Sequence, residues 1–131
     1  MSEINTSLLS KNQNLSKFEI TENFTCIRFI DQNKERFELE FSLEKGTSFN
    51  TFLIKSKEEL FIIHPPEKKY INAFINLISD FFKQFKLRKI NIITGHINPQ
   101  IIETIKNIST HFHNLIITCS NPGFKLISEL W

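Results

Sequence analysis

Polar and apolar residues alternate along much of the first half of the chain. The alternation is most regular over residues 36–43, where Phe37, Leu39, Phe41 and Leu43 share one side and charged residues occupy the other. This pattern is typical of a half-buried antiparallel strand. Shorter apolar stretches between polar turns predict further strands over residues 18–20, 24–30, 49–54 and 60–63. We therefore expect the chain to begin with an antiparallel β-meander.

The spacing of the apolar residues changes after His64-Pro65-Pro66. Between residues 68 and 86 they recur at steps of three and four, which predicts a helix with one wide apolar stripe: Ile71, Phe74, Ile75, Ile78, Phe81, Phe82 and Phe85. The same reading predicts strands over 89–94 and 115–118, and helices over 99–109 and 122–131. Phe124, Ile127 and Trp131 are the expected contacts of the last helix.

A strand, a short polar turn and a helix thus follow one another three times. Such units predict parallel strands joined by right-handed crossovers, with the three turns at one edge of a sheet. We expect that edge to hold His64, His96 and Cys119. The fold class is therefore α/β, with an N-terminal antiparallel meander followed by βα units and three helices.

Two helix starts and one turn have simple backbone explanations. Asn98-Pro99 and Asn121-Pro122 each predict an N-cap followed by the first helical residue, because Asn accepts a hydrogen bond there and Pro lacks only an unneeded N–H. Gly46 interrupts the meander, so we expect a positive φ or a close approach by another segment there.

Bulk properties fit one small domain. The chain has 131 residues, a formal net charge of +2 and two cysteines. Residues 1–16 are polar and aperiodic, so we expect a flexible leader before a single domain over 17–131. The charges are interspersed and no apolar run is long enough to span a bilayer, which argues against nucleic-acid and membrane partners. Two cysteines are too few for a disulfide framework and fit a cytoplasmic location.

The segment Gly46-Thr47-Ser48-Phe49-Asn50-Thr51-Phe52-Leu53-Ile54 resembles the Gly-Thr-Thr-Tyr-Asn-Ser-Tyr-Leu-Ile signature of flavodiiron proteins, which include the cyanobacterial diflavin flavoproteins. The resemblance implies the N-terminal half of a metallo-β-lactamase-like αββα sandwich. It also implies a family chemistry in which a di-iron centre and FMN reduce dioxygen or nitric oxide.

The chain departs from this family where metal ligands are expected. The family places His-x-Glu-x-Asp-His after a strand, and the matching turn here is His96-Ile97-Asn98-Pro99-Gln100-Ile101. Only the first histidine remains, and amides or isoleucine are poor substitutes for the other donors. We therefore expect no catalytic residue, no metal and no cofactor in this chain. We also expect that the chain by itself is not an enzyme.

The remaining donors leave alternatives open. His64, His96 and Cys119 could converge as a zinc site of the His-His-Cys type, depending on strand order. His96 could also be a residual metal ligand or an acid–base residue, but a histidine hydrogen-bonded in a turn beside a helix N-terminus is the favoured explanation. His111 and His113 resemble a metal pair, but histidine near a helix C-terminus is also favoured by the helix dipole. Cys119 beside a helix N-terminus could be a reactive thiol.

Two functions follow from these expectations. The first is a non-catalytic binding or assembly domain whose uncovered sheet face is completed by another copy, a partner or more of a longer chain. The alternative is a fragment or accessory subunit of a flavodiiron-type oxidoreductase. The expected partners are accordingly a second copy of the chain or a flavodiiron-type protein. A small-molecule pocket at the strand-end edge is a third possibility.

Overall fold

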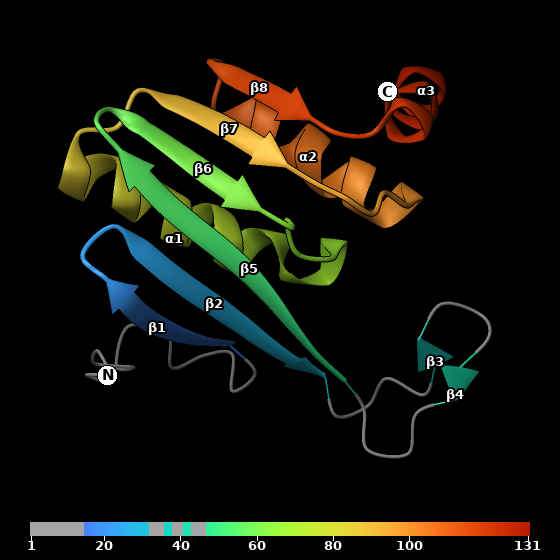
Figure 1. Cartoon of the computed structure of the whole chain (residues 1–131), viewed down its shortest axis with the longest axis horizontal. Coiled ribbons are helices and arrows are strands. Elements are labelled where there is room, and N and C mark those ends of the chain that lie inside the picture. Colours follow the sequence, from blue (N-terminus) through green and yellow to red (C-terminus); the bar gives the residue numbers. More distant parts are fainter. Residues whose placement is uncertain (1–14, 32–35, 38–40, 43–46) are drawn as a thin grey trace.

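A six-stranded sheet forms the centre of the molecule, in the strand order β1-β2-β5-β6-β7-β8 (Figure 1). The computed structural model describes residues 15–31, 36–37, 41–42 and 47–131. The strands of the large sheet are β1 (Leu15–Thr21), β2 (Phe24–Asp31), β5 (Thr47–Ser56), β6 (Glu59–Ile63), β7 (Lys89–Ile93) and β8 (Leu115–Thr118).

The sheet is antiparallel on one side and parallel on the other. β1, β2, β5 and β6 pair antiparallel in that order, and β7 and β8 then run parallel to β6. A tight turn with Lys57 at φ 56° joins β5 to β6, whereas each parallel pair needs a longer helical crossover. The predicted meander followed by βα units is confirmed.

Helices α1 and α2 lie behind the sheet in Figure 1 and cover one face of it. The helical elements are η2 (Lys68–Tyr70), α1 (Ile71–Phe85), α2 (Pro99–His111) and α3 (Asn121–Leu130). Phe74 and Ile78 of α1 and Ile105 of α2 are fully buried, so the apolar sides of both helices form the packing surface. Phe85, the last residue of the predicted stripe, is exposed. No described helix is long and apolar enough to cross a membrane.

The segment over residues 36–43 is not the single strand that its alternation predicts. Instead, two short strands, β3 (Arg36–Phe37) and β4 (Phe41–Ser42), pair with each other. The physical reason is that β2 and β5 hydrogen-bond directly to each other along their length, which leaves no position between them. Gly46 lies outside the described residues, so its expected backbone conformation stays a prediction.

The N-terminal boundary also differs slightly from expectation. β1 begins at Leu15, and Leu15 and Ser16 pair with Phe29 and Arg28 of β2. The last two residues of the expected leader therefore belong to the sheet. The rest of that stretch lies outside the described residues.

Helix α3 docks by its first turn rather than by the side chains expected. Phe124 is 65% exposed and Trp131 is 53% exposed, so neither is the core contact that helical spacing predicts. Gly123 is buried instead, and a Cβ atom added there would lie 2.6 Å from Cδ1 of Ile97. Because glycine has no side chain, the backbone of α3 packs directly against Ile97 in the loop before α2. The expected contact Ile127 is half-buried.

The face of the sheet opposite α1 and α2 carries two rows of side chains, which we call the open face. Residues that pair across neighbouring strands point to the same side, so the register defines both rows. The first row is Phe18, Cys26, Phe52, Ile63, Ile93 and Thr118, and the second is Phe24, Ile54, Phe61, Asn91 and Ile116. No described segment covers these rows in Figure 1.

Candidate functional site

The carboxyl ends of the three parallel strands lie side by side at one edge of the sheet. Ile63, Ile93 and Thr118 are register partners across β6, β7 and β8. The residues that follow them, including His64, His96 and Cys119, therefore lie at the same edge, as the sequence predicts. This edge is the place in an open α/β sheet where ligands most often bind.

His64 is fixed through its backbone rather than through its ring. It has a φ of 57°, a left-handed conformation that costs most residues free energy. Its N–H donates to the Ile93 carbonyl at 3.0 Å, and its own carbonyl accepts from Thr51 Oγ1 at 2.6 Å. The imidazole is exposed and lies over Gly95, where an added Cβ would be 3.6 Å from its Cε1 atom. These bonds hold the strand end in a sharp bend.

His96 lies in the turn between β7 and α2 and is exposed. Thr94 is buried, and its hydroxyl donates to the His96 carbonyl at 2.8 Å. Among the described residues, no group of three or more His, Cys, Asp or Glu side chains could hold a metal ion. His64, His96 and Cys119 are all described, so they share an edge without forming a three-ligand cluster.

Two positions that follow the turn after β7 serve the scaffold. Asn98 has extended backbone angles, and its Oδ1 accepts from the Ile101 N–H at 3.0 Å, so it is the N-cap of α2 with Pro99 as the first helical residue. Ile101 is 5% exposed and belongs to the core. The predicted Asn98-Pro99 cap is therefore confirmed.

The cap of α3 needs a correction. Ser120, not Asn121, is the N-cap: its backbone is extended, and its Oγ accepts from the Gly123 N–H at 3.3 Å. Asn121 is the first helical residue and Pro122 the second. Both arrangements suit proline because the first turn of a helix has no internal acceptor for its N–H groups. The neighbouring serine therefore decides where the helix begins.

Both cysteines are free thiols, in different surroundings. Cys26 is buried in β2, and its burial raises the pKa of the thiol above the usual value, so it stays protonated at neutral pH. Cys119 is half-buried and lies just before α3. A reactive thiol at Cys119 stays the untested alternative that its place beside a helix N-terminus raises.

His111 occupies the last turn of α2. Its Nδ1 lies 2.9 Å from the Asn107 carbonyl oxygen, an arrangement in which the ring satisfies a carbonyl at the helix C-terminus. His113 lies beyond the helix end and is exposed. The structural explanation therefore accounts for His111.

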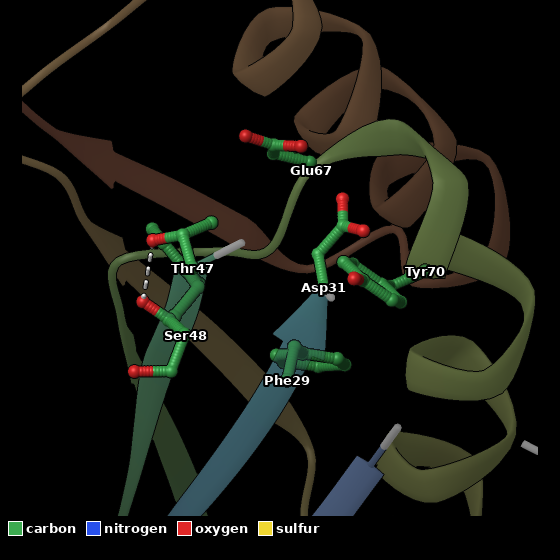
Figure 2. A pocket seen from close by; sticks show the side chains of 7 residues that line it. Phe29, Asp31, Thr47, Ser48, Glu67 and Tyr70 are labelled. Carbon is green, nitrogen blue, oxygen red and sulfur yellow. Dashed lines mark hydrogen bonds between the residues drawn. The ribbon is translucent and has the colours of Figure 1, made fainter. Parts of the chain in front are cut away.

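A small hollow lined by both aromatic and polar residues lies at the same edge of the sheet, next to the end of β2 (Figure 2). Figure 2 shows Asp31 at the tip of β2, Glu67 on the loop before η2 and Tyr70 on η2, with Phe29 beneath them. Its volume of about 30 Å³ is enough for a water molecule or two, but not for an organic substrate. The sequence reasoning missed it because its two carboxylates come from distant segments.

Lys69 stands beside this hollow and forms an ion pair with Asp31. Partial burial opposes the charge on Lys69, but the hydrogen bond to the Asp31 carboxylate and the nearby negative charge outweigh it and raise the pKa of Lys69. Asp31 is therefore engaged in holding η2 against the end of β2. The polar chemistry beside the hollow is therefore that of a structural ion pair.

The fold resembles one half of known metallo-β-lactamase-like proteins. It superposes on metallo-β-lactamase FIM-1 from Pseudomonas aeruginosa with a TM-score of 0.59 and 8% identity, covering 92% of this chain and 48% of the other. It superposes more closely on the Flv1 flavodiiron core from Synechocystis sp. PCC 6803, with a TM-score of 0.74 and 24% identity over 89% of this chain and 28% of that one. The class defined by the fold is thus the metallo-β-lactamase-like class.

Sequence comparison narrows the class to a family. The chain is 31% identical over 115 residues to diflavin flavoprotein A 6 from Nostoc sp. PCC 7120, covering 87% of this chain and 20% of that protein. No family model matches the chain. The protein is a metallo-β-lactamase-like domain of the flavodiiron type, and it spans about a fifth of the length of the diflavin flavoproteins that it matches. The resemblance found from the sequence is confirmed.

Proposed function

We propose that this chain is a flavodiiron-like domain that has lost its di-iron site and acts in binding or assembly. The observation that supports the loss is the use of the ligand turn. Asn98 directs its side chain to the α2 backbone, and Ile101 directs its own into the core. Neither position offers a donor to a metal.

The other donors of the strand-end edge do not fit a di-iron centre either. Such a centre requires several carboxylate and imidazole ligands around two ions. The described residues provide exposed His64 and His96, while Asp31 is paired with Lys69. The proposed function of this chain is therefore binding through its surface, without a redox step of its own.

Metal analysis of the purified chain tests the loss of the site. We expect iron and zinc well below one ion per chain after purification without chelators, and no rise in Tm on adding zinc, because ligand binding would stabilise the folded state. A His64→Ala/His96→Ala double variant is the control, and its metal content should equal that of the wild type. The proposal would be contradicted if the wild type contained one or more iron ions per chain and the double variant did not.

The second candidate function is an accessory part of a flavodiiron-type oxidoreductase that reduces dioxygen or nitric oxide. The match covers most of this chain but only a fifth of the relative. This favours the accessory role, because the chain resembles one part of a larger flavodiiron-type protein. Consumption of dioxygen or nitric oxide by a complete flavodiiron protein should then change when this chain is added. Equal rates with and without the chain would count against the accessory role.

A further inference from the structure

The open face has the composition of a protein interface. All residues of its two rows are apolar except Thr118 and Asn91, and no charged residue lies within them. An apolar centre depleted of charge, with polar groups confined to its margin, distinguishes the core of an interface from ordinary surface.

Exposure marks the same surface. Ile93 is 38% exposed and Ile116 is 47% exposed, whereas Ile90 and Ile92 of β7, which face the helices, are fully buried. The aromatic residues Phe18, Phe24, Phe52 and Phe61 are only partly buried. A contiguous apolar surface of this kind marks a contact site for another macromolecule.

The polar groups at the margins have partners within the chain. At one end, Arg28 donates to Asn50 at 3.2 Å and stacks on the Phe18 ring. At the other end, Glu59 pairs with Lys89 at 3.1 Å and accepts from the Asn91 amide at 3.1 Å. Glu59 and Lys89 therefore neutralise each other, and Arg28 lies outside the two rows. The best complement of these apolar rows is another flat apolar surface.

The open face is the apolar centre of a whole sheet face, and the size of that sheet face suits contact with a sheet of the same dimensions. Strands lie ~4.8 Å apart and rise ~3.3 Å per residue, so the six-stranded sheet is about 29 Å wide and about 21 Å long on average. Two such faces in contact would cover about 600 Å² each. Their sum of about 1,200 Å² reaches the lower end of the range for specific interfaces.

We propose that a second copy of this chain packs its open face against the first, in a twofold dimer with the layers helix, sheet, sheet, helix. Two sheets that pack face to face lie ~10 Å apart and interdigitate their side chains. A twofold contact uses the same apolar rows twice, so each copy supplies the cover that the other lacks. The dimer deepens the proposed assembly role and rests on it.

Size-exclusion chromatography with light scattering, carried out over a wide range of protein concentration, tests this dimer. The wild type should have the mass of two chains, and Ile93→Glu/Ile116→Glu should weaken the dimer at least about a hundredfold by burying unpaired charges. Both residues are exposed in the single chain, so circular dichroism should show the fold unchanged. Phe124→Glu, on the exposed side of α3, is the matched control and should remain dimeric.

Three outcomes would overturn the dimer. They are a wild type that is a monomer at every concentration, a dimer that survives Ile93→Glu/Ile116→Glu, and a dimer that only Phe124→Glu dissociates. A monomer whose open face becomes protected from hydrogen exchange only when a flavodiiron protein is added would assign that protein as the occupant instead. Because metal content is measured separately, a metal-free monomer would reject the dimer alone, and a dimer that contains iron would reject the proposed metal loss alone.

Discussion

At the scale of single residues, two fully buried threonines differ in whether their hydroxyl groups have a partner. Thr51 donates to the His64 carbonyl, whereas the Thr104 hydroxyl has no hydrogen-bond partner in the described part of the chain. A buried polar group without a partner lowers stability, and removing one member of a buried hydrogen bond does the same. The same substitution should therefore have opposite effects at the two positions.

Valine has nearly the shape of threonine, so it isolates the hydroxyl group. We expect Thr104→Val to raise the free energy of unfolding by about 1 kcal/mol, and Thr51→Val to lower it by about 1–3 kcal/mol. Denaturant unfolding at one protein concentration measures both. Changes of the same sign in the two variants would contradict the assigned hydrogen bonds.

Glu59 is the residue from which a pH dependence follows. Its hydrogen bond from Lys89 is the main cause that lowers the pKa of its carboxyl group, and the Asn91 amide adds to it. A carboxyl pKa that is lower in the folded state gives stability that is present above the unfolded pKa and lost as pH falls through the folded one. This contribution should therefore disappear on acidification.

An NMR titration of the Glu59 side chain tests this expectation. Its midpoint should lie below that of an ordinary glutamate. Lys89→Gln removes the main cause and should move the midpoint upward while leaving Asn91 in place. A midpoint that is the same in the wild type and in Lys89→Gln would show that the ion pair is not what perturbs Glu59.

At the scale of elements, the sequence predicted periodic features better than junctions. The stripe through Phe74, Ile78 and Phe81 predicted α1 because a surface helix must bury every third or fourth residue. The start of α3 was misplaced because Ser120 and Asn121 are both good caps and Pro122 is tolerated at either of the next positions. Local propensity does not separate two adjacent candidates.

Alanine substitution of the two candidate caps tests the corrected start of α3. Ser120→Ala removes the acceptor of the Gly123 N–H and should reduce stability by about 1 kcal/mol, while Asn121→Ala should have a smaller effect or none. Hydrogen exchange at the Gly123 amide provides a local readout and should accelerate only in Ser120→Ala. A larger loss in Asn121→Ala would restore the asparagine as the cap.

At the scale of the whole molecule, the order of alternating and helical patterns was enough to predict the layers. It could not predict long-range pairing, because alternation shows which side of a strand is apolar without naming its neighbour. For this reason β3 and β4 were expected as one strand, and the hollow between Asp31 and Glu67 was not foreseen. The edge with His64, His96 and Cys119 was predicted, since the carboxyl ends of consecutive parallel strands meet.

The mixed sheet also determines which of its contacts form at the lowest entropic cost. β5 and β6 are joined by the turn at Lys57 and pair from Ser56↔Glu59 outward, so their pairing closes a very short loop. The parallel pairs of β6 with β7 and of β7 with β8 require a whole helix between the strands, so they close much longer loops. Because the entropic penalty of closure grows with loop length, the β5–β6 hairpin forms at low entropic cost, as does the β1–β2 hairpin, whose turn between Thr21 and Phe24 is equally short. The edge that carries His64 and His96 requires the larger closure around α1.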